Sequence, residues 1–144
     1  MSFVVMCIGN PEGGDDAVGH YIAERLKDSE IDVIDCGTNP ENYTSVVKRK
    51  NPDKLIIIDA ADMGLDPGEI RKISKDKIGV MTISTHGIPL SILMGYLEKS
   101  VKEVILIGIQ PKTMSGDMTD IVKTAGEKLI NIILKKGEKN IKGI

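Results

Sequence analysis

Three short apolar runs, separated by segments with helical spacing, most constrain the fold of this chain. They lie within residues 3–8, 54–59 and 102–109, and each is typical of a strand buried on both faces of a sheet. Strands that alternate with helices indicate a largely parallel sheet with helices on both faces. At 144 residues the chain has the length of one ordinary domain. We therefore expect a single α/β domain spanning residues 1–144.

Helical periodicity fills the segments between these strands. Residues 15–27 place Val18, Ile22 and Leu26 on one stripe, which is a helical spacing. Three further helices are expected at residues 40–50, at 89–99 and from Thr119 onward. The residues expected to face inward in the last helix are Ile121, Ala125, Leu129, Ile132 and Ile133.

Shorter strands are expected at residues 31–35, 69–74 and 80–84. The strand at 69–74 follows Asp59 after only nine residues, too few for a helical crossover, so we expect it to run antiparallel. Residues 137–144 are polar, and we expect them to form a frayed tail.

Charge and composition exclude several classes of function. The 19 basic and 21 acidic residues leave a net charge of −2, so the chain lacks the basic surface that nucleic acids need. Its apolar runs are too short to span a membrane, and its N-terminus lacks a signal-peptide pattern. We expect a cytoplasmic protein that binds no nucleic acid and does not insert into a membrane, with Cys7 and Cys36 as buried, reduced thiols.

A glycine-rich loop follows the first strand, over residues 9–14, and leads into Asp15 and Asp16. It does not match a phosphate-binding loop, because these two acids stand where a phosphate cradle has Lys and Ser or Thr. Their carboxylates repel a pyrophosphate but attract a cation. We expect Asp15 to cap the following helix, which leaves Asp16 as a candidate ligand.

Two further loops at the same edge of the sheet carry groups that bind metals or move protons. Asp59 ends the third strand, where we expect it to be partly buried and to orient the loop, whereas Asp62 lies further out over the crevice. His86 stands three residues before Pro89, where a helix begins. The positive end of that helix favours a neutral imidazole, which is able to bind metal.

Two carboxylates and one neutral imidazole suit a borderline divalent ion such as Ni²⁺, Zn²⁺, Fe²⁺ or Cd²⁺. The second histidine, His20, is four residues after Asp16, and such a pair is able to chelate. Because His20 continues a polar stripe toward Glu24, we expect it instead to be exposed or to support the site indirectly.

Two other classes of protein share parts of this pattern. A phosphoacceptor receiver domain also has an acidic pair after its first strand, an Asp that ends the third (Asp59), a Ser or Thr after the fourth (Ser84, Thr85) and a late Lys (Lys112). In receivers the acidic pair directly follows the strand, whereas six residues intervene here. A nucleotide-binding α/β module is the other alternative, and the two carboxylates of the first loop disfavour it.

Four motifs, in order along the chain, resemble those of the [NiFe]-hydrogenase maturation endopeptidases. They are Gly9-Asn10 with Gly14-Asp15-Asp16 and Gly19; Ile58-Asp59-Ala60 with Asp62-Met63-Gly64 and Pro67-Gly68-Glu69; Thr85-His86 with Pro89-Leu90; and Gly108-Ile109-Gln110-Pro111. The chain most resembles the type that processes the large subunit of the formate-hydrogenlyase hydrogenase. This resemblance implies a three-layer α/β/α sandwich around a five-stranded, mostly parallel mixed sheet with one antiparallel strand.

The resemblance also implies a function. Members of that family remove a C-terminal extension from the hydrogenase large-subunit precursor after nickel insertion, and they are grouped with aspartic-type peptidases. The family's metal-binding residues correspond here to Asp16, Asp62 and His86, with catalysis assigned to Asp16 or Asp62. The implied nickel is supplied by the precursor, although other divalent metals suit the same ligands. Either the metal or a carboxylate is able to activate the water for hydrolysis.

Overall fold

The computed structural model describes residues 2–78 and 89–144, and within them it has one five-stranded sheet. The strands are β1 (Phe3–Cys7), β2 (Asp32–Asp35), β3 (Lys54–Ala60), β4 (Ile70–Ile73) and β5 (Glu103–Ile109). Their order across the sheet is β2-β1-β3-β5-β4. Neighbouring strands are parallel except β4 and β5. The expected mixed sheet with one antiparallel strand is confirmed.

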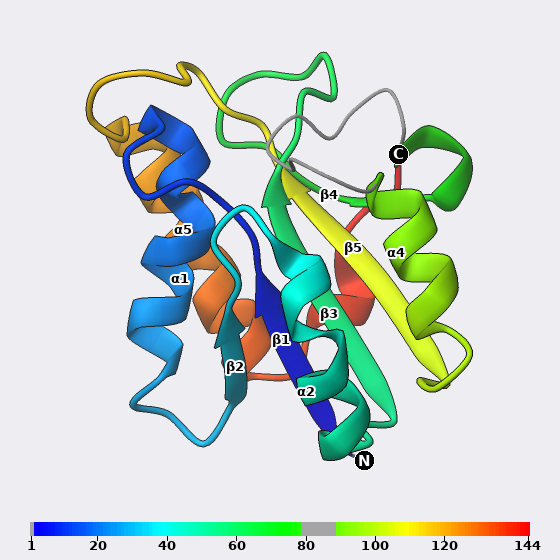
Figure 1. The fold of residues 1–144 in the computed structure, drawn as a ribbon. Coiled ribbons are helices and arrows are strands. Elements are labelled where there is room, and N and C mark those ends of the chain that lie inside the picture. The colour runs from blue at the N-terminus through cyan, green and yellow to red at the C-terminus, as the bar shows by residue number, and fades with distance from the viewer. Residues whose placement is uncertain (1, 79–88) are drawn as a thin grey trace.

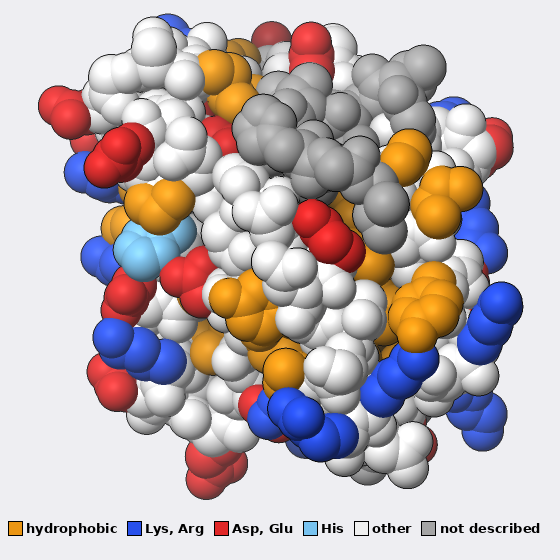
Figure 2. Space-filling view, in the orientation of Figure 1, with side chains coloured by type: hydrophobic (Ala, Val, Ile, Leu, Met, Phe, Trp, Pro, Cys, Tyr) orange, Lys and Arg blue, Asp and Glu red, His pale blue; other side chains and the backbone are white. Residues whose placement is uncertain are grey.

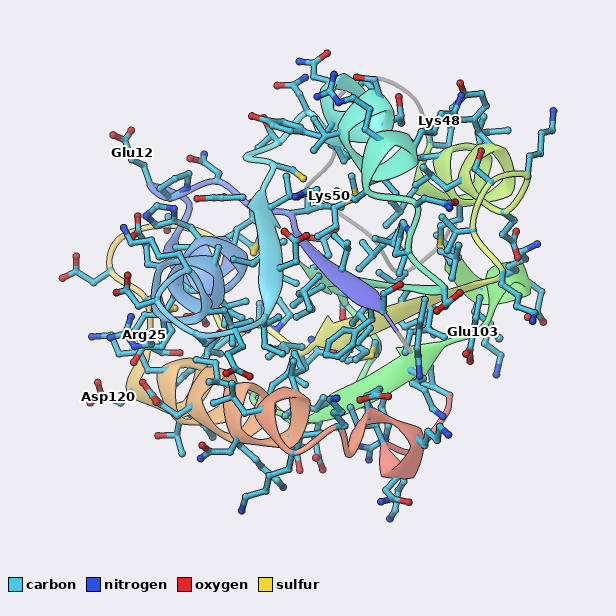
Figure 3. All side chains as sticks on the ribbon, turned by 90° about the horizontal axis from the view of Figure 1, so that it is seen from below. Glu12, Arg25, Lys48, Lys50, Glu103 and Asp120 are labelled. Atoms are coloured by element: carbon cyan, nitrogen blue, oxygen red, sulfur yellow. The ribbon has the colours of Figure 1, made fainter. Side chains whose placement is uncertain are left out.

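Four α-helices in the described part of the chain cover the two faces of this sheet. They are α1 (Val18–Leu26), α2 (Thr44–Lys50), α4 (Leu90–Leu97) and α5 (Asp120–Leu134). Helices α1 and α5 lie on one face, and α2 and α4 lie on the other (Figure 1, Figure 3). The three-layer sandwich is therefore confirmed.

Alternate residues of the central strands fill two separate hydrophobic cores. Val4 and Met6 of β1 pack in the core beneath α2 and α4, whereas Val5 and Cys7 pack in the core beneath α1 and α5. Every residue of β3 is buried. A parallel strand that is covered on both faces presents no side to water, which explains its continuous apolar run.

Short 3-10 helices make two of the α-helices begin later than expected. The first, η1 (Gly14–Ala17), precedes α1, and η2 (Pro40–Tyr43) precedes α2. The stripe predicted for α1 is confirmed, since Val18, Ile22 and Leu26 are all fully buried.

The inward stripe predicted for α5 is wrong in its first turn. Ile121 is 49% exposed, and Val122 is buried in its place. Ala125, Leu129 and Ile133 are buried as expected. The helix is therefore rotated slightly from the orientation that its apolar spacing predicts.

The short strand β4 pairs antiparallel with β5, with Ile70 opposite Ile109, as its short connection predicts. Its other edge is covered by the end of the chain. The backbone N–H of Lys72 donates to the Lys142 carbonyl at 2.8 Å, and that of Ile144 donates to the Lys72 carbonyl at 3.0 Å. An edge strand offers unpaired backbone groups, and this segment satisfies some of them.

The C-terminal segment also carries one half of a buried ion pair. The ammonium of Lys54, which is 2% exposed, lies 2.8 Å from Oε2 of Glu138, which is 6% exposed. A buried cation requires such a partner. These contacts differ from the frayed tail expected for residues 137–144, because the polar residues there bind to β3 and β4 rather than to water.

Cys7 and Cys36 are both buried and not bonded to each other, as predicted. Burial is the main cause that raises the pKa of each thiol. The described residues include no helix that is both long and apolar enough to cross a membrane. The extended segment expected at 80–84 lies outside the described residues.

Candidate functional site

The candidate site lies at one edge of the sheet, beyond the carboxyl ends of β1 and β3. From β1 the chain continues to β2 on one side, whereas the strands beyond β3 lie on the other side. In open α/β sheets this divergence leaves a crevice in which ligands bind. The loops that follow β1, β3 and β5 lie together at this edge (Figure 1). The topology therefore brings the first two predicted acidic loops to adjacent positions.

Asp16 lies in η1, within the loop after β1, and only 4% of it is exposed. The backbone N–H of Asn10 donates to its Oδ2 at 2.9 Å. The loop folds back so closely that a Cβ on Gly9 would lie 2.0 Å from the carbonyl oxygen of Asp16. Only glycine fits there. The Asp16 carboxylate is thus held near the end of β1. It is more deeply buried than expected for a metal ligand in an exposed loop.

Asp15 does not cap α1, and this expectation is wrong. Neither η1 nor α1 has a side-chain cap. The Asp15 carboxylate instead accepts hydrogen bonds from the backbone N–H groups of Lys112 (2.7 Å), Thr113 (3.0 Å) and Thr119 (2.7 Å), and from the Thr119 hydroxyl (2.9 Å). Burial raises the pKa of the Asp15 carboxyl, but these hydrogen bonds outweigh that effect, so its pKa lies below the ordinary value.

Asp62 follows β3 and, in contrast to Asp16, is exposed. Its Oδ1 accepts hydrogen bonds from the backbone N–H of Gly64 and from Nε2 of Gln110, both at 3.2 Å. Of the two acids predicted as ligands, Asp62 is therefore the one that a solvent molecule or a substrate reaches directly.

Asp59 and His86 are the other residues that the sequence predicts at this edge of the sheet. Asp59 lies near the end of β3 and is fully buried. A phosphoacceptor must be reached by its phosphodonor, so this burial argues against the receiver alternative. His86 lies outside the described residues, as do Ser84 and Thr85.

His20 belongs to a surface cluster with Glu24 and Asp35, whose potential ligand atoms lie within 4.8 Å of one another. Its Nδ1 is 2.6 Å from Oδ2 of Asp35, and its Nε2 is 3.7 Å from Oε1 of Glu24. Glu24 also pairs with Lys27. Figure 2 shows the partly exposed histidine beside acidic side chains. Contacts between α1 and the end of β2 account for this cluster, and they leave His20 partly exposed at the surface.

The segment after β5, residues 110–119, contacts both acidic loops. Gln110 binds the loop of Asp62 through its side chain, and the start of α5 binds Asp15. The first loop fits tightly against this segment at Gly14, whose φ is +64° and where a Cβ would lie 2.6 Å from the backbone nitrogen of Ser115. A glycine is therefore required at that contact.

The sequence does not predict the role of this segment, because most of its contacts with the acidic loops use backbone groups. The one available signal is Gln110, a polar residue that directly follows an apolar strand and is only 7% exposed. A buried side-chain amide almost always has hydrogen-bond partners within the protein.

Comparisons with known proteins identify a family that matches this chain. A family model described as "Hydrogenase maturation protease" (HycI) matches residues 17–136. The hydrogenase 3 maturation protease of Escherichia coli K12 is 39% identical over 140 residues, which are 90% of this chain and 89% of that protein.

Solved structures give the same result. The solution structure of the endopeptidase HycI from Escherichia coli superposes with a TM-score of 0.91 at 37% identity, over 99% of this chain and 96% of that one. A crystal structure of a [NiFe] hydrogenase maturation protease HycI from Thermococcus kodakarensis superposes with a TM-score of 0.82 at 32% identity, over 95% of this chain and 92% of that one. Both the arrangement of the strands and most of the chain length are shared.

Proposed function

The chain belongs to the hydrogenase maturation protease family, and from that premise we propose that it removes the C-terminal extension of a [NiFe]-hydrogenase large-subunit precursor after nickel has been inserted. The observation that carries this proposal is the position of two acids in the loops that follow the adjacent strands β1 and β3, one buried (Asp16) and one exposed (Asp62). Carboxylates at such an edge of a sheet are suited both to binding a cation and to moving a proton.

Metal recognition is the first step of the proposal. Asp16, Asp62 and His86 are the proposed ligands, two oxygens and one nitrogen donor, a set that suits nickel and other borderline divalent ions. The metal is part of the precursor, so it belongs to the substrate. Each charge-assisted contact to it contributes about 1.5–3 kcal/mol, and three together discriminate strongly against a precursor without metal.

Peptide hydrolysis is the second step, and it requires a water molecule from which a proton is withdrawn. We assign this role to Asp62, because it is exposed and Asp16 is not. Such a role for a carboxylate fits an aspartic-type peptidase. Asp16 then acts mainly through the docked metal, held in orientation by the backbone of Asn10.

The cytoplasm is the proposed compartment, since the precursor is processed before the hydrogenase is complete. The two buried thiols, which form no disulfide, suit a reducing environment.

The test compares variants in cleavage of a nickel-loaded precursor, with the length of its tail read by mass spectrometry. Asp62→Asn, Asp16→Asn and His86→Ala are each expected to lower the cleavage rate by about 100-fold or more, while circular dichroism reports an intact fold. Asp66→Asn is the matched control, because Asp66 is an exposed acid in the same loop as Asp62, and it is expected to cleave at the normal rate. Normal cleavage by all three site variants would remove the proposed site.

A further inference from the structure

Gln110 is held at the site edge by its own backbone. It directly follows β5, where its N–H donates to the Glu69 carbonyl at 2.9 Å and its carbonyl accepts from the Gly68 N–H at 2.9 Å. These two bonds extend the pairing of β4 with β5 by one position. The side chain of Gln110 therefore starts from a fixed point on the sheet, beneath the loop that carries Asp62.

The side-chain amide of Gln110 uses its oxygen to hold that loop. Oε1 accepts hydrogen bonds from the backbone N–H groups of Met63 at 2.7 Å and of Leu65 at 3.3 Å. Backbone N–H groups on both sides of Gly64 thus converge on a single atom. An amide oxygen has two lone pairs, and both are used here.

The nitrogen of the same amide points to Asp62. Nε2 donates to Oδ1 of Asp62 at 3.2 Å and to the Pro111 carbonyl at 3.4 Å. Oδ1 of Asp62 also accepts from the Gly64 N–H at 3.2 Å. With two donors on Oδ1, the carboxylate is oriented so that Oδ2 is the oxygen left for a ligand, since no residue in the described part of the chain donates to it.

We propose that Gln110 is a positioning residue that aims the Asp62 carboxylate at the substrate, an inference that rests on the proposed function. Only an amide has the required chemistry at this position. A carboxylate would keep the acceptor for Met63 and Leu65 but would set a second negative charge against Asp62, and an apolar side chain would lose both contacts. Hydrogen-bonding partners of catalytic or ligating carboxylates are typically worth about 10–100-fold in affinity or activity.

The variant Gln110→Glu separates positioning from a purely structural role. It keeps the size of the side chain and an oxygen for the two backbone N–H groups, and it replaces the NH₂ group that donates to Asp62 and to the Pro111 carbonyl with a charged oxygen. Hydrogen exchange of the Met63 and Leu65 amides, followed by NMR, is expected to remain slow, while kcat/KM for the nickel-loaded precursor falls about 10–100-fold. Thr124→Glu adds the same charge at an exposed position on α5 and is expected to cleave normally.

Slow exchange together with a normal kcat/KM in Gln110→Glu would overturn the inference. Asp62→Asn, assayed in parallel, keeps this outcome distinct from failure of the proposed function: if Asp62→Asn is inactive and Gln110→Glu is normal, only the role of Gln110 is wrong. If both cleave normally, the proposed site itself is wrong.

A spectroscopic measurement tests the contact even if Gln110→Glu does not fold. Gln110 is the only glutamine in the chain, so its side-chain NH₂ pair is assignable in a ¹⁵N spectrum. In Asp62→Ala one of these two protons is expected to shift upfield and to exchange faster, because its acceptor is lost. Asp66→Ala is the control, and it is expected to leave the pair unchanged. An NH₂ pair that is identical in wild type and Asp62→Ala would contradict the proposed contact.

Discussion

Asp15 and Asp16 are neighbours in the chain with the same side chain, but they face different surroundings. Asp15 is fully buried and accepts hydrogen bonds from the loop before α5 and from the first residues that lead into it. Asp16 accepts from Asn10 within its own loop. One carboxylate therefore joins two distant loops, and the other stays within the loop that follows β1. This division of roles depends on partners about 100 residues away, which local sequence does not specify.

Replacing Asp15 is expected to destabilise the fold in a pH-dependent manner. In Asp15→Asn an NH₂ group faces backbone donors, so we expect a loss of about 3 kcal/mol in the free energy of unfolding at pH 7. Because the pKa of Asp15 is lower in the folded state than in the unfolded state, its contribution is complete above about pH 4 and is lost as the pH falls through the folded-state pKa.

Urea unfolding at pH 7 and pH 3 measures this effect. The stability difference between wild type and Asp15→Asn is expected to shrink at pH 3. Asp117→Asn, at an exposed acid of the loop that Asp15 holds, is expected to change stability by less than about 0.5 kcal/mol. A stability difference of the same size at both pH values would show that the charge of the Asp15 carboxylate does not stabilise the loop.

At the scale of elements, the placement of α1 depends on how closely it approaches β1. A Cβ on Gly19 would lie 2.2 Å from the carbonyl oxygen of Ile8, so the first turn of α1 rests directly on the backbone that follows β1. Because η1 and Asp16 immediately precede this turn, the same contact also sets the position of the first acidic loop.

Two helical glycines are expected to respond to alanine in opposite directions. Gly19→Ala is expected to lower the free energy of unfolding by about 1–3 kcal/mol, because the backbone of Ile8 must move. Gly95→Ala in α4, where nothing lies within 4 Å of the added Cβ, is expected to raise it by about 0.5–1 kcal/mol. Thermal unfolding of both variants and of the wild type shows whether each substitution stabilises or destabilises the protein. A neutral or stabilising Gly19→Ala would contradict the close approach.

Strands and helices were largely predictable because their periodicities are strong. The apolar runs of β1, β3 and β5 and the stripe of α1 follow directly from burial on one or both faces. The first turn of α5 was not predictable, since Ile121 and Val122 are both apolar and spacing alone does not choose between them. The tail was mispredicted because its partner, the buried Lys54, is not recognisable as buried from sequence.

In the molecule as a whole, the order of the strands determines where the candidate site lies, because β1 and β3 are neighbours in the sheet. Alternating strands and helices predict that acidic loops after β1 and β3 meet at one edge, and the topology agrees. The supports of that edge were not predictable, because they join residues such as Asp62 and Gln110, 48 positions apart, through a buried amide. A polar residue after an apolar strand is a weak signal by itself, and only the folded chain reveals what it binds.

The length of the precursor's tail after incubation with the wild-type protein, with and without nickel, tests recognition through the metal most directly. Mass spectrometry of both reactions gives the answer in one experiment. If Asp16, Asp62 and His86 recognise the metal that the precursor carries, only the nickel-loaded precursor loses its C-terminal extension. Equally efficient cleavage of the nickel-free precursor would contradict recognition through the metal.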